Sequence, residues 1–282
     1  MDHVRWLERP NLTRPVLLAA FEGWNDAGEA ATTAVRYLRD RWGAHRVATI
    51  DPEEFFDFTS TRPQVRLRNG TTREIVWPAN ELWSASLATE GRDVVMIIGS
   101  EPQLKWRTFC GELVDAAREL DVELVVVLGA LLADVAHTRP VRVTGAAASP
   151  ELVGRSGLVR SQYEGPTGIV GVLHDALARA EIPSASLWAS VPHYVGATQS
   201  PKAALALIER TARLIDVPVV TADLAQLAVD YERQVDEVVA ADDDAVAYIR
   251  RLEEDADREG LELRSGEELA AELQQFLRDQ GD

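Results

Sequence analysis

Apolar runs of strand length alternate with amphipathic stretches of helix length along the N-terminal part of the chain. The runs lie at residues 15–22, 93–99 and 123–129, and amphipathic stretches lie between them at 29–42 and 103–120. Near-continuous apolar runs are typical of parallel strands that are covered on both faces. Strands separated by helices therefore predict a three-layer α/β/α fold around a mostly parallel, doubly wound sheet.

A β-hairpin interrupts this alternation. Its two short β-prone runs, 65–68 and 73–77, flank Asn69-Gly70. Asn-Gly readily adopts the positive φ angles of a tight turn, so the two runs are expected to pair. The α/β part is completed by a helix, a strand and an amphipathic helix, at 167–180, 185–191 and 201–215.

Beyond Pro218 the pattern contains helices alone. Apolar residues recur at spacings of four and three over 224–238 and again over 245–256, on either side of an acidic turn. Two such stripes joined by a short loop predict a C-terminal helical hairpin. We therefore divide the chain into an α/β core domain, residues 1–220, and a helical appendage, residues 221–282.

The apolar stripes also bear on the oligomeric state. An amphipathic hairpin has to bury its stripe, either on its own core or on a neighbouring subunit. The sequence leaves both arrangements open, and we expect a homo-oligomer with part of its interface in residues 224–258.

Charge limits the classes of partner. The 282 residues include 29 Lys and Arg against 46 Asp and Glu, a net charge of −17. Residues 242–282 contribute about half of it, with fourteen acids and five arginines for a net −9, which is typical of a solvated helical face. A surface this acidic repels phosphate backbones, so no nucleic-acid partner is expected.

Hydropathy and the supply of Cys and His residues bear on membrane insertion and on metal binding. The longest apolar run, 124–133, is far shorter than the roughly 20 residues that span a bilayer. The single Cys110 excludes a disulfide framework and a Cys-based zinc site within one chain, and the five histidines lack metal-ligand spacing. We expect a cytoplasmic protein without a membrane partner, a metal or another cofactor.

Polar and aromatic residues follow several of the predicted strands. In an open α/β sheet, ligands lie beyond the carboxyl ends of the strands, so these residues define a candidate binding mouth. Tryptophans outside a core suit a protein-binding surface, although a Trp under a loop can equally belong to a satellite core. The candidate mouth comprises Glu22, Trp24, Asn25, Asp26, Glu101, Lys105, Trp106, Tyr163, Glu164, His193 and Tyr194.

The mouth residues permit two catalytic arrangements. Glu101 and Lys105 would form an acid/base pair, or His193 would act as a general base oriented by Asp26 or Glu101. We favour simpler interpretations of both. Glu101 and Lys105 would form an i,i+4 ion pair at the surface, and His193 would be a loop histidine without a catalytic role. The loop after the first strand lacks the Lys and Ser/Thr of a phosphate loop, and Gly99-Ser100-Glu101 is not a nucleophile elbow. We therefore assign no catalytic residue.

Four short motifs lie at the predicted strand ends and helix starts: Phe21–Gly28, Gly99–Pro102 with Trp106, Tyr163–Gly168 and Val191–Tyr194. Together they resemble the bacterial branch of the proteasome assembly chaperone family, over about residues 12 to 260. The resemblance implies a Rossmann-like α/β core, related in shape to nucleoside phosphorylases, with helices after it. It also implies a non-enzymatic role in binding proteasome α-subunits, usually as an oligomer.

One feature of the family is missing. Members that dock into the pockets of the proteasome α-ring can use a C-terminal hydrophobic-Tyr-x tail, whereas this sequence ends Asp279-Gln280-Gly281-Asp282. Docking by such a tail is therefore not expected. We expect a protein-binding scaffold without turnover chemistry. The alternative is a small-molecule hydrolase or phosphorylase-like enzyme that acts at the carboxyl end of the sheet.

Overall fold

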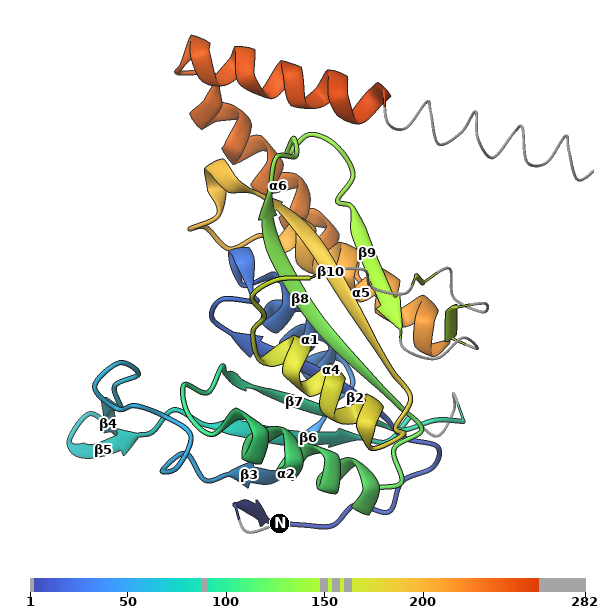
Figure 1. Ribbon diagram of the computed structural model, residues 1–282. Coiled ribbons are helices and arrows are strands. Elements are labelled where there is room, and N and C mark those ends of the chain that lie inside the picture. Colours follow the sequence, from blue (N-terminus) through green and yellow to red (C-terminus); the bar gives the residue numbers. More distant parts are fainter. Residues whose placement is uncertain (1–2, 88–90, 148–151, 154–157, 160–163, 259–282) are drawn as a thin grey trace, which may run out of the picture.

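The computed structural model describes residues 3–87, 91–147, 152–153, 158–159 and 164–258. Its eight-stranded sheet has the order β1-β3-β6-β7-β2-β8-β10-β9 (Figure 1). The four central strands run parallel: β7 (Val94–Ser100), β2 (Val16–Glu22), β8 (Leu124–Ala133) and β10 (Ser184–Pro192). Antiparallel strands extend this centre on both sides: β6 (Asn80–Ala85), β3 (His45–Ile50) and β1 (Val4–Trp6) beyond β7, and β9 (Val143–Ala147) beyond β10.

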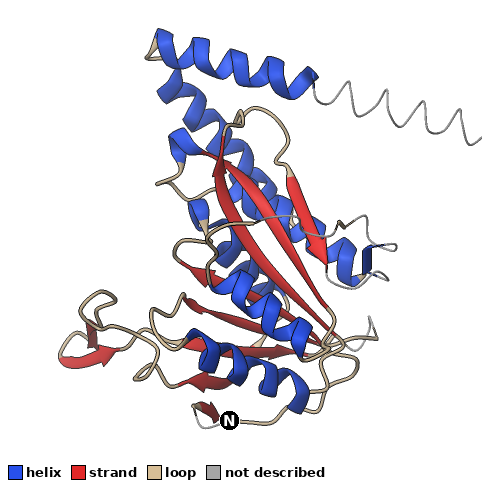
Figure 2. Cartoon of the chain, in the orientation of Figure 1, coloured by secondary structure: helices blue, strands red, loops and turns tan. Residues whose placement is uncertain are grey.

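Helices cover both faces of the sheet (Figure 2). The first apolar core joins α1 (Ala30–Arg41) and α5 (Pro201–Ile215) to one set of alternating strand residues, which includes Leu18 and Met96. The second core joins α2 (Trp106–Glu119) and α4 (Ile169–Arg179) to the other set, which includes Leu17 and Ile97. Successive strand side chains point to opposite faces, so strands that are apolar throughout supply both cores. The predicted three-layer α/β/α fold is confirmed.

The expected hairpin forms a small sheet of its own. β4 (Gln64–Arg68) pairs with β5 (Thr72–Val76). Asn69 and Gly70 both take positive φ angles, as the tight turn requires. The hairpin projects from the body of the molecule, well away from β8 and β10 (Figure 1).

Helix α6 (Ala222–Val239) packs on α5 and completes the first core. Four of the predicted stripe residues are buried, namely Leu224, Ala228, Tyr231 and Val235, whereas Val238 is 74 % exposed. The stripe is thus covered within the chain. These four side chains therefore need no neighbouring subunit to cover them, and the interface expected in residues 224–258 stays a prediction.

A second C-terminal helix occupies residues 243–258. Asp242 caps it, because its Oδ1 accepts hydrogen bonds from the backbone N–H groups of Asp244 (2.9 Å) and Ala245 (3.2 Å). Ile249 on this helix packs against Ala136, in the segment after β8. In the described part of the chain, no helix combines the length and hydropathy that a bilayer crossing requires.

Candidate functional site

Asp26 caps helix α1 from the loop that follows β2. Its Oδ1 accepts hydrogen bonds from the backbone N–H groups of Ala31 (2.7 Å) and Thr32 (3.3 Å), and Thr32 Oγ1 donates to Oδ2. Burial raises the pKa of Asp26, although these hydrogen bonds and Arg36 act in the opposite direction. A carboxylate here satisfies N–H groups at the positive end of the helix dipole. The fold alone therefore explains this residue.

Asn25, Glu101 and Gly168 meet although they are far apart in the sequence. Glu101 Oε1 accepts hydrogen bonds from Asn25 Nδ2 (2.8 Å) and from the backbone N–H of Ile169 (2.8 Å), the first residue of α4. A Cβ on Gly168 would lie 2.2 Å from Asn25 Nδ2 and 2.7 Å from Glu101 Oε1. Three of the four sequence motifs thus form one close-packed junction, which ties the ends of β2 and β7 to the start of α4.

Glu22, the last residue of β2, contacts neighbours on both sides. Its Oε2 accepts a hydrogen bond from Ser100 Oγ (2.9 Å), which is its partner in the β2–β7 register. Its Oε1 pairs with Arg36 on α1. Both carboxylate oxygens therefore hold secondary-structure elements together.

Lys105 and Trp106 also form structural contacts. Lys105 pairs with Glu54 rather than with Glu101, so the acid/base pair considered from the sequence does not form. Trp106 donates its indole N–H to the carbonyl of Pro102. Lys105, Trp106 and Glu101 are all absent from the lining of the cleft described below.

His193 lies in η3 (His193–Val195), directly after β10. Its Nδ1 is 3.1 Å from Asp134 Oδ1, and its ring packs edge-on against Tyr248 of the last helix, with the ring centroids 5.7 Å apart. The carboxylate beside His193 is therefore Asp134. It is neither Asp26 nor Glu101, as the general-base arrangement would require.

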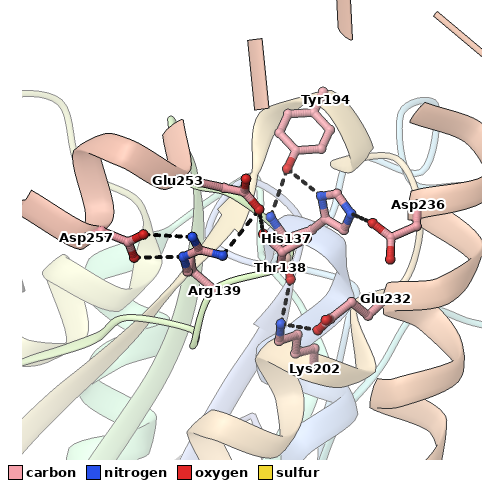
Figure 3. A network of polar contacts seen from close by, with 9 residues as sticks. All are labelled: His137, Thr138, Arg139, Tyr194, Lys202, Glu232, Asp236, Glu253 and Asp257. Atoms are coloured by element: carbon pink, nitrogen blue, oxygen red, sulfur yellow. Dashed lines mark hydrogen bonds and ion pairs between the residues drawn. The ribbon is translucent and has the colours of Figure 1, made fainter. Parts of the chain in front are cut away.

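His137 is buried at the centre of a polar network between the core and the C-terminal helices (Figure 3). Its backbone N–H donates to Tyr194 Oη (2.8 Å), which also lies 2.9 Å from Nδ1, and Nε2 lies 3.0 Å from Asp236 Oδ1 on α6. Lys202 on α5 donates to the His137 carbonyl and pairs with Glu232 on α6. Burial raises the pKa of Tyr194 to about 12, so its hydroxyl stays protonated at neutral pH.

Thr138 and Arg139, the next two residues, bind the last helix. We call residues 137–139 together with their partners the seam. Arg139 donates two hydrogen bonds of 2.8 Å to the Asp257 carboxylate and one of 3.2 Å to Glu253, to which Thr138 also donates. Within the acidic C-terminal region, Glu253 and Asp257 therefore pair with Arg139, although Asp257 also stays exposed to solvent as predicted. Their partner Arg139 is 114 and 118 residues away in the sequence, so no local pattern indicates the contact.

A cleft of about 1420 Å³ opens at the carboxyl ends of β2 and β8. Its walls come from the loop 23–29, the end of β8, the start of α4 and the loop 196–199. Val159, the segment 165–167 before α4, and residues of β9 and β10 form the rest of its described lining. This is the edge of the sheet at which ligands of α/β proteins bind.

The predicted mouth contributes only a part of this lining. Trp24, Asn25 and Asp26 line the cleft, and Glu164 is exposed beside it, next to a lining glycine. Tyr163 lies outside the described residues. Among the other predicted residues, Glu101 belongs to the junction and Tyr194 to the seam. The remaining four make the separate contacts described above: Glu22, Lys105, Trp106 and His193.

Comparison with known proteins identifies the family. A model of the PAC2 family matches residues 20–239. The chain belongs to the PAC2 family. Among solved structures, a PAC2 family protein from Streptomyces avermitilis is 46% identical, with a TM-score of 0.78 over 83% of this chain and 99% of that one. The proteasome-assembly chaperone homologue Rv2125 of Mycobacterium tuberculosis is also 46% identical, with a TM-score of 0.76 over the same shares, 83% and 99%.

A more distant solved structure shares the fold. PbaB of Pyrococcus furiosus, an archaeal proteasome activator, is 18% identical, with a TM-score of 0.67 over 84% of this chain and 99% of that one. Among proteins with curated descriptions, none matches the chain. The resemblance drawn from the four motifs is confirmed at the level of the family.

Residues of the four sequence motifs thus make tertiary contacts in this PAC2 family protein. The sequence predicts where these residues lie, but it does not predict which residues they contact. Asn25, Asp26 and Glu101 were placed correctly at strand ends, yet each holds a helix or a loop. The sequence does not predict the contacts of His137 and Arg139. A single histidine and one of many arginines form no spacing pattern that would distinguish them. Within the described ranges, no three His, Cys, Asp or Glu side chains gather as a metal site requires.

Proposed function

We propose that this PAC2 family protein is a cytoplasmic protein-binding scaffold without turnover chemistry. We further propose that it forms a homo-oligomer and that its partners are proteasome α-subunits. The observation that carries the proposal is the exposed apolar face of the β4–β5 hairpin.

The hairpin presents large apolar side chains to water. Val65 pairs with Ile75 across the two strands, and Leu67 and Trp77 continue the same face, because alternate residues point to the same side. All four side chains are exposed, although Trp77 makes an edge-on contact with Phe58. An isolated two-stranded hairpin is at best marginally stable in water, and contiguous exposed apolar surface marks a contact site. A protein partner that covers this face would stabilise the hairpin.

Charge distinguishes the hairpin from the rest of the molecule. Residues 62–77 carry four arginines and one glutamate, in a chain whose net charge is −17. Opposite charges on two surfaces steer their encounter and fix their register. The hairpin is therefore suited to an acidic protein surface.

The contacts of the mouth residues support a scaffold rather than an enzyme. General acid–base catalysis requires its groups within hydrogen-bond reach of a common reacting atom. The groups that a hydrolase or phosphorylase-like enzyme would use are instead engaged in separate structural contacts: Glu22, Asp26, Glu101, Lys105 and His193.

The choice of partner draws on the relatives. The protein from Mycobacterium tuberculosis that is 46% identical to this chain is named a proteasome-assembly chaperone homologue. On the basis of that name, we propose proteasome subunits as the partners of this chain as well.

Co-purification from the native cell tests the proposal. We expect core-particle α-subunits to be enriched with the wild-type protein and depleted with Leu67→Ser, which places a hydroxyl on the hairpin face. Leu7→Ser is the matched control, since Leu7 and Leu67 are both 61 % exposed. The scaffold proposal fails if neither α-subunits nor half-assembled particles are enriched and deletion leaves particle yield unchanged. A monodisperse monomer in light scattering at micromolar concentration would refute the oligomer.

A further inference from the structure

The cleft at the ends of β2 and β8 is larger than a pocket for a single metabolite. Its volume is about 1420 Å³, whereas pockets for small ligands usually measure roughly 300–1,000 Å³. Because it also extends along β9 and β10, it has the dimensions of a groove. Its size suits a segment of polypeptide.

Large apolar side chains line this groove and are open to water. Trp24, at the rim, is 69 % exposed, and Leu131, Leu132 and Val159 are exposed as well. Leu131 and Leu132 lie at the end of β8, whose first seven residues are buried. Exposed apolar groups that gather in one concave surface are typical of a protein contact site. The groove therefore offers apolar area to a partner.

An indole ring forms part of the floor. Trp188 on β10 lies against Gly129 of β8, where an added Cβ would be 2.6 Å from two of its ring carbons. The ring is half-buried and lines the cleft. With Trp24 at the rim, the groove presents two of the aromatic groups that dominate binding energy at protein interfaces.

The charged groups of the lining are acidic. Glu29 carries an exposed carboxylate, whereas the carboxylate of Asp26 is buried and accepts hydrogen bonds from the start of α1. None of the described lining residues is Lys or Arg. Burial lowers the pKa of His174, so its imidazole is neutral at pH 7. A carboxylate in the groove would meet like charges, whereas an ammonium or guanidinium group would be attracted.

We propose that the groove binds an internal, apolar peptide segment that carries Lys or Arg and belongs to a protein partner. A free C-terminal tail is disfavoured because its carboxylate would meet the exposed carboxylate of Glu29. The inference rests on the proposed protein-binding function and adds to it a second binding surface, distinct from the hairpin, and the chemistry of the segment bound there.

Peptide binding to the purified full chain tests the inference. The probe is a fluorescent, N-acetylated and C-amidated octapeptide of Leu, Phe and Lys residues, compared by anisotropy with the same peptide carrying Glu in place of Lys. We expect the Lys peptide to bind at least about tenfold more tightly than the Glu peptide, and its free-carboxylate form to bind more weakly than the amide.

Variants locate the binding site. Trp24→Ala and Leu132→Ala are expected to weaken binding of the Lys peptide about tenfold, as for interface anchors. Leu104→Ala is the matched control for Leu132→Ala, since the two leucines are 47 % and 53 % exposed, and it should leave binding within about twofold. Circular dichroism verifies that each variant is folded.

The two proposals fail separately. Equal binding of the Lys and Glu peptides, or no effect of either groove variant in a folded protein, overturns the groove inference even if α-subunits co-purify. If the Lys peptide binds as expected but no α-subunit is enriched from cells, the groove inference stands and the choice of proteasome partner is wrong.

Discussion

At the start of α4, two side chains occupy the space that a methyl group on residue 168 would fill. Asn25 Nδ2 would lie 2.2 Å and Glu101 Oε1 2.7 Å from that methyl carbon. The φ angle of Gly168 is −97°, which any residue adopts, so the constraint is steric rather than conformational. The Glu-Gly-Pro-Thr-Gly motif therefore specifies close packing at this position.

Gly168→Ala should lower the free energy of unfolding by about 1–3 kcal/mol, because the extra methyl overpacks the junction. Gly111→Ala provides the control. Gly111 lies inside α2 with open space around it, and there alanine should raise stability by about 0.5–1 kcal/mol. Urea denaturation followed by tryptophan fluorescence measures both. Similar effects of the two substitutions would contradict the steric argument.

The last helix, residues 243–258, is weakly attached to the core. Its buried apolar contacts are few, with Ile249 and Leu252 packing against Ala136. The pairing of Arg139 with Asp257 lies at the surface, where such pairs contribute at most about 1 kcal/mol. A helix held in this way opens locally at a lower free energy than the sheet does.

Arg139→Ala should increase hydrogen exchange across residues 243–258 while changing the global free energy of unfolding by less than about 1 kcal/mol. Arg233→Ala is the matched control, because Arg233 pairs with Asp230 and Glu237 on its own helix. Hydrogen exchange read out by mass spectrometry measures both variants. Equal exchange of the last helix in the two would show that the Arg139 contacts do not hold it.

At the scale of the whole molecule, the core and the C-terminal region share packing. Leu224 of α6 belongs to the same apolar cluster as the buried residues of α1 and α5. The division of the chain at residue 220 stays a prediction. The packing of α6 indicates that the two parts, at least as far as this helix, unfold together.

Tryptophan fluorescence and far-ultraviolet circular dichroism should therefore report one coincident urea transition. All seven tryptophans precede residue 221, whereas the dichroism also includes α6. Two-state unfolding of one packed unit makes the two probes agree. Repeating the measurement at two protein concentrations separates the effect of any subunit association. A second transition seen by dichroism alone would indicate an independently folded appendage.

Local sequence patterns determined most of the fold. Hydrophobic periodicity depends on neighbouring residues, so it located the central strands, the flanking helices and α6. Asn69-Gly70 located the hairpin because a tight turn is a property of the turn residues themselves. The four motifs together determined the family. The antiparallel strands at the sheet edges are shorter and half-exposed, and their pattern is correspondingly weaker.

Only the tertiary structure decided what the candidate residues contact. The sequence placed Glu101 at a strand end, but its hydrogen bond to the backbone of Ile169 depends on how α4 crosses the sheet. Likewise, Arg139 meets Asp257 only because the last helix lies over the segment after β8. Such contacts join residues that are distant in the chain. Their energies depend on burial and on three-dimensional proximity, which no local pattern encodes.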